Sequence, residues 1–204
     1  EQEMDFVDSH QYYYEWGWGE TEKYSSHAQI NGYPTIMHNM AFQRLNNKPF
    51  FVSEWDMPWP NSYRAEAALW FPAVACLQNW SGMTIHTYGY GHDMSRHDLL
   101  GKIAATSTVG GVAYREGIFA CWNDPAKFGL FYHAALMVRR CDITPLKKKI
   151  GVTIPDKSKW QVDIHRTGLE VHRLATVLDG EEPVGCDEVK PATEIIQHED
   201  SNII

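Results

Sequence analysis

Short apolar, strand-like runs alternate along this chain with longer segments of helical periodicity. The strand-like runs cover residues 4–14, 49–54 and 82–88. The helical segments cover residues 33–47, 63–79, a stretch near 99–115, and 124–140. Because a parallel neighbour can only be reached by a long connection, this alternation predicts parallel strands joined by crossover helices. We therefore expect an α/β fold with three strand–helix units over residues 1–140.

Polar residues mark the expected starts of two of these helices. Ser62 precedes the segment 63–79, and its hydroxyl can accept a hydrogen bond from an amide of the first turn. Asp124 is followed by Pro125. Asp is a preferred capping residue and proline is favoured at the first helical position, so this pair predicts the start of the last helix.

Polar and aromatic residues gather at the exits of all three strand-like runs. They are His10 and Tyr12 on the first, Glu54 and Trp55 on the second, and His86 and Tyr88 on the third. In a (β/α) barrel the carboxyl ends of the strands form the active-site face. An open sheet is conceivable, but no Gly-rich phosphate loop follows any strand. Three units do not close a barrel, so we predict the C-terminal part of a (β/α)8 barrel, about strands six to eight.

The composition excludes some classes of function. The formal net charge of −8 leaves no basic stripe to neutralise phosphates, which argues against nucleic acid as a partner. Eight Trp and ten Tyr suit either a large core or a cleft in which flat rings lie against sugar faces. The four cysteines have no CxxC spacing, so no metal or redox pair is indicated. No apolar run spans a membrane and no cofactor motif is visible, so we expect neither a membrane nor a cofactor.

The order and spacing of the strand ends resemble the C-terminal part of the catalytic barrel of the clan A retaining glycoside hydrolases. This superfamily includes the family 5 cellulases and mannanases and the family 2 β-galactosidases. Residues 10–12 are similar to its sixth strand, residues 53–55 to its seventh, which carries the nucleophile, and residues 82–88 to its eighth. The resemblance covers residues 4–140.

The resemblance implies a retaining hydrolase of β-linked oligo- or polysaccharides, in which Glu54 is the nucleophile and forms a covalent glycosyl-enzyme. It also implies substrate-binding roles for His10, Tyr12, Trp55, Trp59, His86 and Tyr88. The acid/base Glu of the family lies on the fourth strand, so we expect it, and the rest of the barrel, from an upstream segment or another chain. The family usually has Trp on the eighth strand, where this chain has His86 and Tyr88. A secreted or periplasmic location is favoured for such a polysaccharide-degrading enzyme.

Other interpretations stay open beside this one. A non-catalytic carbohydrate-binding or scaffold protein could keep the same barrel and aromatic residues. Trp55 could pack against the barrel rim, and Asp8 or Asp56 could be an alternative acid. The loop that contains His92, Asp93, His97 and Asp98 could suggest a metal. However, its histidines are five residues apart, which suits a helical ligand pair poorly, so we predict no metal site.

The character of the chain changes after residue 140. Alternation of apolar and polar residues at 160–165 and 168–174 predicts short strands. The acidic tail 179–204 predicts a poorly ordered segment or part of an incomplete unit. We expect residues 141–204 to form a small β-rich extension, or the start of a further domain, that is peripheral to catalysis.

Overall fold

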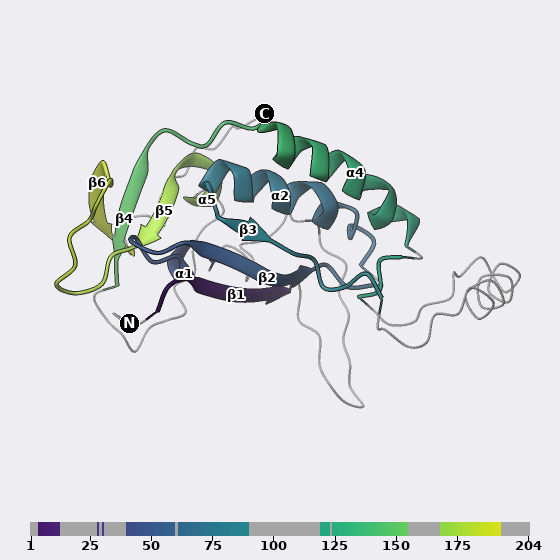
Figure 1. Cartoon of the computed structure of the whole chain (residues 1–204), viewed down its shortest axis with the longest axis horizontal. Helices are drawn as coiled ribbons and strands as arrows, with labels where there is room; N and C mark the ends of the chain where they lie inside the picture. The colour runs from purple at the N-terminus through teal and green to yellow at the C-terminus, as the bar shows by residue number, and fades with distance from the viewer. Residues whose placement is uncertain are drawn as a thin grey trace, which may run out of the picture.

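The computed structural model of the protein describes residues 4–12, 28, 30, 40–59, 61–89, 119–122, 124–154 and 168–192. These residues form two small parallel sheets and the helices that pack on them (Figure 1). Within the described part of the chain, no helix combines the length and the apolar character needed to cross a membrane.

The first sheet has the strand order β1-β2-β3, and both neighbouring pairs are parallel. Its strands are β1 (Val7–Tyr12), β2 (Phe50–Asp56) and β3 (Gly82–Met83). The predicted parallel order of the three runs is confirmed, although β3 is shorter than the predicted run. The backbone beyond β3 still follows β2, because Thr84 N donates to Val52 O at 2.9 Å and His86 N donates to Trp55 O at 3.1 Å.

Two long helices cover one face of this sheet. They are α2 (Glu66–Gln78) and α4 (Pro125–Arg140), which lie side by side in Figure 1. Of the predicted helix over 33–47, the structure describes α1 (Met40–Gln43), and the stretch near 99–115 lies outside the described residues. Helices α1 and α2 pack on the sheet through a buried apolar cluster formed by Met40, Phe50, Val52, Trp55, Met57, Ala67 and Phe71.

The start of one long helix agrees with the prediction and the start of the other does not. Asp124 caps α4 by accepting from Ala126 N at 3.1 Å, and Pro125 is its first residue. The predicted cap of α2 by Ser62 is wrong, because the helix begins only at Glu66 and has no side-chain cap. The side chain that forms a hydrogen bond before the helix is that of Asn61, one residue earlier. Its Oδ1 accepts from the Tyr63 amide at 2.8 Å and stabilises the turn that precedes α2.

The second sheet has the strand order β5-β4-β6 and is also entirely parallel. Its strands are β4 (Lys149–Thr153), β5 (Arg173–Thr176) and β6 (Glu188–Pro191). The predicted strand over 168–174 is wrong in its first half, where the chain forms the short helix α5 (Gly168–Val171). The tail is better ordered than predicted as far as residue 192, since it contributes β6. The predicted strand at 160–165 lies outside the described residues.

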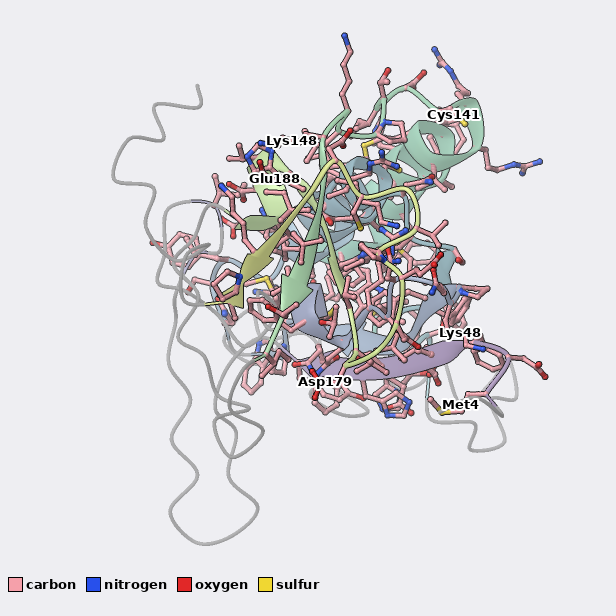
Figure 2. The ribbon with its side chains drawn as sticks, turned by 90° about the vertical axis from the view of Figure 1, so that its left-hand side faces the viewer. Met4, Lys48, Cys141, Lys148, Asp179 and Glu188 are labelled. Atoms are coloured by element: carbon pink, nitrogen blue, oxygen red, sulfur yellow. The ribbon has the colours of Figure 1, made fainter. Side chains whose placement is uncertain are left out.

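Helix α2 joins the two sheets into one packed unit. Val74 of α2 packs in an apolar cluster with Ile150, Val152, Leu169 and Leu174. The buried Gln78 donates to the carbonyls of Leu169 and His172, at 2.6 Å each, and accepts from Leu174 N at 2.9 Å. Figure 2 shows the second sheet from the side, with Lys148 and Glu188 near one end of its strands and Asp179 near the other. Neither sheet closes into a barrel within the described residues, so the (β/α)8 barrel remains a prediction.

Candidate functional site

A bulge in the β1–β2 ladder shapes the candidate site. Val7, Asp8 and Ser9 pair with the three successive residues 50–52, but His10 then pairs with Glu54, so that Ser53 is an extra residue. A bulge of this kind bends the strand and re-aims the side chains beyond it. As a result Glu54 lies beside His10 at the carboxyl end of the ladder.

Glu54 receives contacts from two predicted site residues. The Tyr12 hydroxyl donates to Glu54 Oε2 at 2.5 Å, and His10 Nδ1 lies 3.4 Å from the same oxygen. The Glu54 side chain is 36% exposed, so a ligand can reach it. The two contacts hold one oxygen of the Glu54 carboxyl in place and leave the other free of them.

Ser53 and Asp8 form a second set of contacts next to Glu54. The Ser53 hydroxyl donates to Asp8 Oδ2 at 2.7 Å, and Ser53 N donates to Asp8 Oδ1 at 3.0 Å. Desolvation raises the pKa of the Asp8 carboxyl, but the hydrogen bonds from Ser53 outweigh it and leave this pKa below its ordinary value. Asp8 is therefore an ionised acceptor rather than a proton donor.

The same contacts bear on serine chemistry. His10 Nε2 lies 2.9 Å from Ser53 Oγ, so that Ser53, His10 and Glu54 follow one another in the order of a hydrolase triad. However, Asp8 accepts from both the hydroxyl and the amide of Ser53. The hydroxyl hydrogen thus points away from the histidine, and the serine amide is not available to stabilise an oxyanion. The arrangement does not favour acyl transfer.

An aromatic group adjoins Tyr12 on the side of the third strand. The Tyr12 ring lies edge-on to His86, with centroids 5.8 Å apart, and 4.9 Å from the ring of Phe119. Phe119 is 5% exposed, and the centroids of its ring and of the His86 ring are 5.5 Å apart. The structure therefore brings His86 to the group around Glu54. The sequence did not reveal Phe119, because a lone aromatic far along the chain carries no motif.

The contacts described for Trp55 and Tyr88 are with residues other than Glu54. Trp55 is 2% exposed and stacks on Phe71, with ring centroids 4.2 Å apart, so its burial supports the packing role that was its alternative. Tyr88 is 59% exposed and its ring lies 6.1 Å from that of Phe128 on α4. Trp59 follows β2 in a turn and is half-buried.

A network of four buried or half-buried charges lies just beyond Glu54 and was not predicted. Lys127 Nζ donates to Asp56 Oδ1 at 2.7 Å and Oδ2 at 2.6 Å, and both side chains are 0% exposed. Arg64 Nε donates to Asp124 Oδ2 at 2.6 Å. Desolvation raises the pKa of Asp56 to about 7, in spite of Lys127. Asp56 is thus sealed from solvent and is not placed to act as an acid on a substrate.

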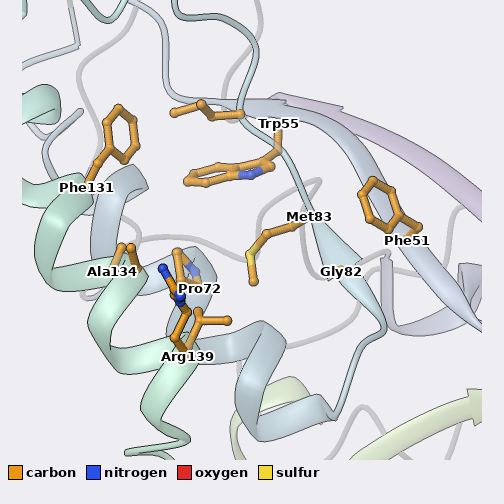
Figure 3. A pocket seen from close by; sticks show the side chains of 11 residues that line it. Phe51, Trp55, Pro72, Gly82, Met83, Phe131, Ala134 and Arg139 are labelled. Atoms are coloured by element: carbon orange, nitrogen blue, oxygen red, sulfur yellow. The ribbon is translucent and has the colours of Figure 1, made fainter.

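An apolar cavity of about 380 Å³ opens beside β3 (Figure 3). Its walls come from both sides of the strand: Phe51, Gly82 and Met83 from the sheet, and Phe131 and Ala134 from α4. Glu54, His10 and Tyr12 do not line it, so it is separate from the polar group. In the described residues no strand pairs with the outer edge of β3.

A comparison of this chain with models of protein families, with curated proteins and with solved structures gives no match. The described residues contain no group of three or more His, Cys, Asp or Glu side chains that could hold a metal ion. The loop with His92 and His97 lies outside them.

Proposed function

We propose that this chain carries the nucleophile of a retaining glycoside hydrolase that acts on β-linked oligo- or polysaccharides. The observation that carries the proposal is the contact of Glu54 with Tyr12 and His10 at the carboxyl end of two parallel strands. The resemblance of the strand ends to clan A hydrolases supports the same role.

In this proposal the Glu54 carboxylate attacks the anomeric carbon and displaces the leaving group, which forms a covalent glycosyl-enzyme. Tyr12 holds the attacking carboxylate in place through its hydrogen bond at 2.5 Å. A retaining enzyme needs a second carboxyl group about 5–5.5 Å away, which protonates the leaving oxygen and then activates water. We assign that group to a segment outside this chain.

Among the described residues no strand pairs with the outer edge of β3 itself (Gly82–Met83), which supports a contribution from elsewhere. The cavity beside it has apolar walls on both sides of the strand, with Phe51 on one side and Phe131 on the other. Exposed sheet edges are normally paired or covered. A further strand with apolar side chains on both faces would extend the parallel sheet at this edge, as the next strand of a barrel does.

The test uses the complete polypeptide and a panel of dinitrophenyl β-glycosides. These substrates have leaving groups that need no acid, so they report on the nucleophile directly. Glu54→Gln should lower turnover by several orders of magnitude with little change in folding. The matched control is Glu170→Gln on α5, which removes a carboxylate far along the chain and should keep turnover near that of the unsubstituted protein.

Chemical rescue separates this proposal from a non-catalytic sugar-binding protein. Azide should restore turnover in Glu54→Ala and give a glycosyl azide of inverted configuration, because it attacks from the side that the carboxylate vacated. A fluorosugar inactivator should label Glu54. Labelling of Asp8, or binding of sugars without turnover in the unsubstituted protein, would contradict the proposal.

A further inference from the structure

The buried pair Lys127–Asp56 is the strongest feature that the proposed chemistry does not use. Both side chains are 0% exposed, and both carboxylate oxygens of Asp56 accept from Lys127. Removing two charges from water is costly, and apolar residues often stabilise a core as well as a buried ion pair does. Such a pair is therefore better explained by the orientation that it imposes than by stability alone.

The position of Asp56 in the sheet shows what it can orient. Asp56 is the last residue of β2, and its partner across the ladder is Tyr12, the last residue of β1. Tyr12 is also the residue that donates to Glu54. Lys127 of α4 therefore binds one residue of the Tyr12–Asp56 pair, the last rung of this ladder, and the other residue of that pair is the hydrogen-bond donor to Glu54.

Further contacts fix the same rung. Asp56 Oδ1 accepts from the Met57 amide at 2.7 Å, which ties the carboxylate to the backbone where the strand ends. On the other side of β2, His86 N donates to Trp55 O at 3.1 Å. The ends of β1 and β2 and the backbone that continues from β3 therefore meet at the residues next to Asp56.

One further carboxylate acts on the pair. The charge of Asp124 contributes to the raised pKa of Asp56, and Arg64 donates to Asp124 at 2.6 Å and 3.2 Å. Asp124 caps α4, and Lys127 lies in the first turn of the same helix. At the start of α4, Asp124 is thus paired with Arg64, and Lys127 donates to Asp56 of the sheet.

We infer that Lys127 and Asp56 are positioning residues, which hold the last rung of the β1–β2 ladder so that Tyr12 stays in contact with Glu54. The inference deepens the proposed function, because Glu54 is its nucleophile. The geometry itself can be tested without a substrate.

The experiment compares Lys127→Met with the unsubstituted chain by amide hydrogen exchange and by the ¹³C signal of the Glu54 carboxyl. The amides of Met57 and His86 report on the last rung, and those of Val7 and Ser81, which donate to Pro49 O and Phe50 O at 2.9 Å, report on the strand starts. We expect exchange at the last rung to speed up at least about tenfold, with little change at the strand starts. The Glu54 carboxyl signal should move as the contact with Tyr12 is lost.

Matched variants keep the result interpretable. Lys148→Met removes a half-exposed lysine from the second sheet and should change neither readout. If Lys127→Met fails to fold, Asp56→Asn with Lys127→Met leaves no unpaired charge and gives the same readouts. Uniform acceleration at both ends of the strands, or an unchanged Glu54 signal, would overturn the inference. If the local effects appear but Glu54→Gln retains turnover, the proposed function fails and the positioning role stands.

Discussion

The two parallel sheets of this protein carry most of their charged residues at opposite ends. The first sheet begins with Val7, Phe50 and Gly82; Asp8 lies in its second rung, and Glu54, His10 and Asp56 lie toward its carboxyl end. The second sheet begins with Lys149, Arg173 and Glu188 and ends with Thr153, Thr176 and Pro191. One charged residue, Lys190, lies near the carboxyl end of β6. Its Nζ is 2.8 Å from Oε1 of Glu188 at the start of the same strand.

From this difference we propose different roles for the two sheets. In parallel α/β folds the carboxyl ends of the strands form the functional face, and features at the amino ends contribute to stability. The first sheet has the expected form of a site, with half-exposed polar groups above a packed core. The second sheet packs on α2, and in this proposal it is a support. Each of the following experiments tests that division.

The largest effect on stability is expected in the core of the second sheet. Leu174 of β5 is 0% exposed and packs in the cluster shared with α2. Leu174→Ala should lower the free energy of unfolding by roughly 2–5 kcal/mol, because it leaves a cavity. Val189→Ala, at a position that is 44% exposed, is the control and should change stability little. Loss of turnover in Leu174→Ala without loss of stability would break the division between the sheets.

The next effect is a pH dependence that arises from Asp56 of the first sheet. The pKa of Asp56 rises from 3.8 to about 7 in the folded protein, so the native state keeps a proton in this interval that the unfolded state has lost. Its contribution therefore lowers the free energy of unfolding as pH rises from about 4 to about 7, by at most about 4 kcal/mol. Below and above that window its contribution is constant.

The fall in the free energy of unfolding between about pH 4 and pH 7 can be measured by denaturant unfolding at a series of pH values; we call it the pH slope. Asp56→Asn should remove it, since the amide does not titrate. Glu188→Gln on the second sheet should leave it intact, because the hydrogen bonds from Lys190 and Lys148 lower the pKa of Glu188 below 4.5. A group of that kind contributes stability above pH 4.5, which is lost only as pH falls through the lowered pKa. A slope that survives in Asp56→Asn would contradict the prediction.

Local sequence patterns predicted much of the first sheet. Alternation of strand and helix gave the three parallel strands, and Asp124 with Pro125 located the start of α4, because both signals act within a few residues. The contact of Tyr12 and His10 with Glu54 follows from the rule that parallel strand ends meet at one edge. By contrast, the helix at Gly168–Val171 was expected as a strand, since four residues are too few to distinguish the two periods.

Pairings between side chains of the sheet and of α4 were a part that the sequence did not predict. Asp56 and Lys127 are 71 residues apart, and no spacing rule joins them. One signal was present, because a lysine in the first turn of a helix opposes the helix dipole and needs a nearby acid. The bulge at Ser53 was equally hidden. It depends on tertiary contacts with Asp8 and His10 and not on a turn residue.

A smaller effect is expected from the single hydrogen bond of Tyr12. Tyr12→Phe keeps the ring that contacts His86 and Phe119 but removes the donor to Glu54. A hydrogen bond to a charged group contributes about 1.5–3 kcal/mol, so turnover of the complete polypeptide should fall about 10- to 100-fold. Tyr132→Phe on α4, where the residue is 68% exposed, should leave turnover unchanged. Equal losses in both variants would mean that the polar end of the first sheet has no special role.

The smallest effect is expected from the surface charges of the second sheet. Lys148 Nζ lies 3.1 Å from Glu188 Oε1, with side chains 43% and 32% exposed (Figure 2). Water and salt screen such a pair, and Lys190 still contacts Glu188 when Lys148 is removed. Lys148→Met should therefore shift the midpoint of thermal unfolding by less than about 2 °C, and by less still in high salt. Lys127→Met, measured in parallel, should shift it much further and without relief by salt, because that pair is sealed from solvent. Similar shifts for the two variants would show that the buried pair has no greater influence than a surface one, and the contrast between the sheets would then rest on Glu54 and Tyr12 alone.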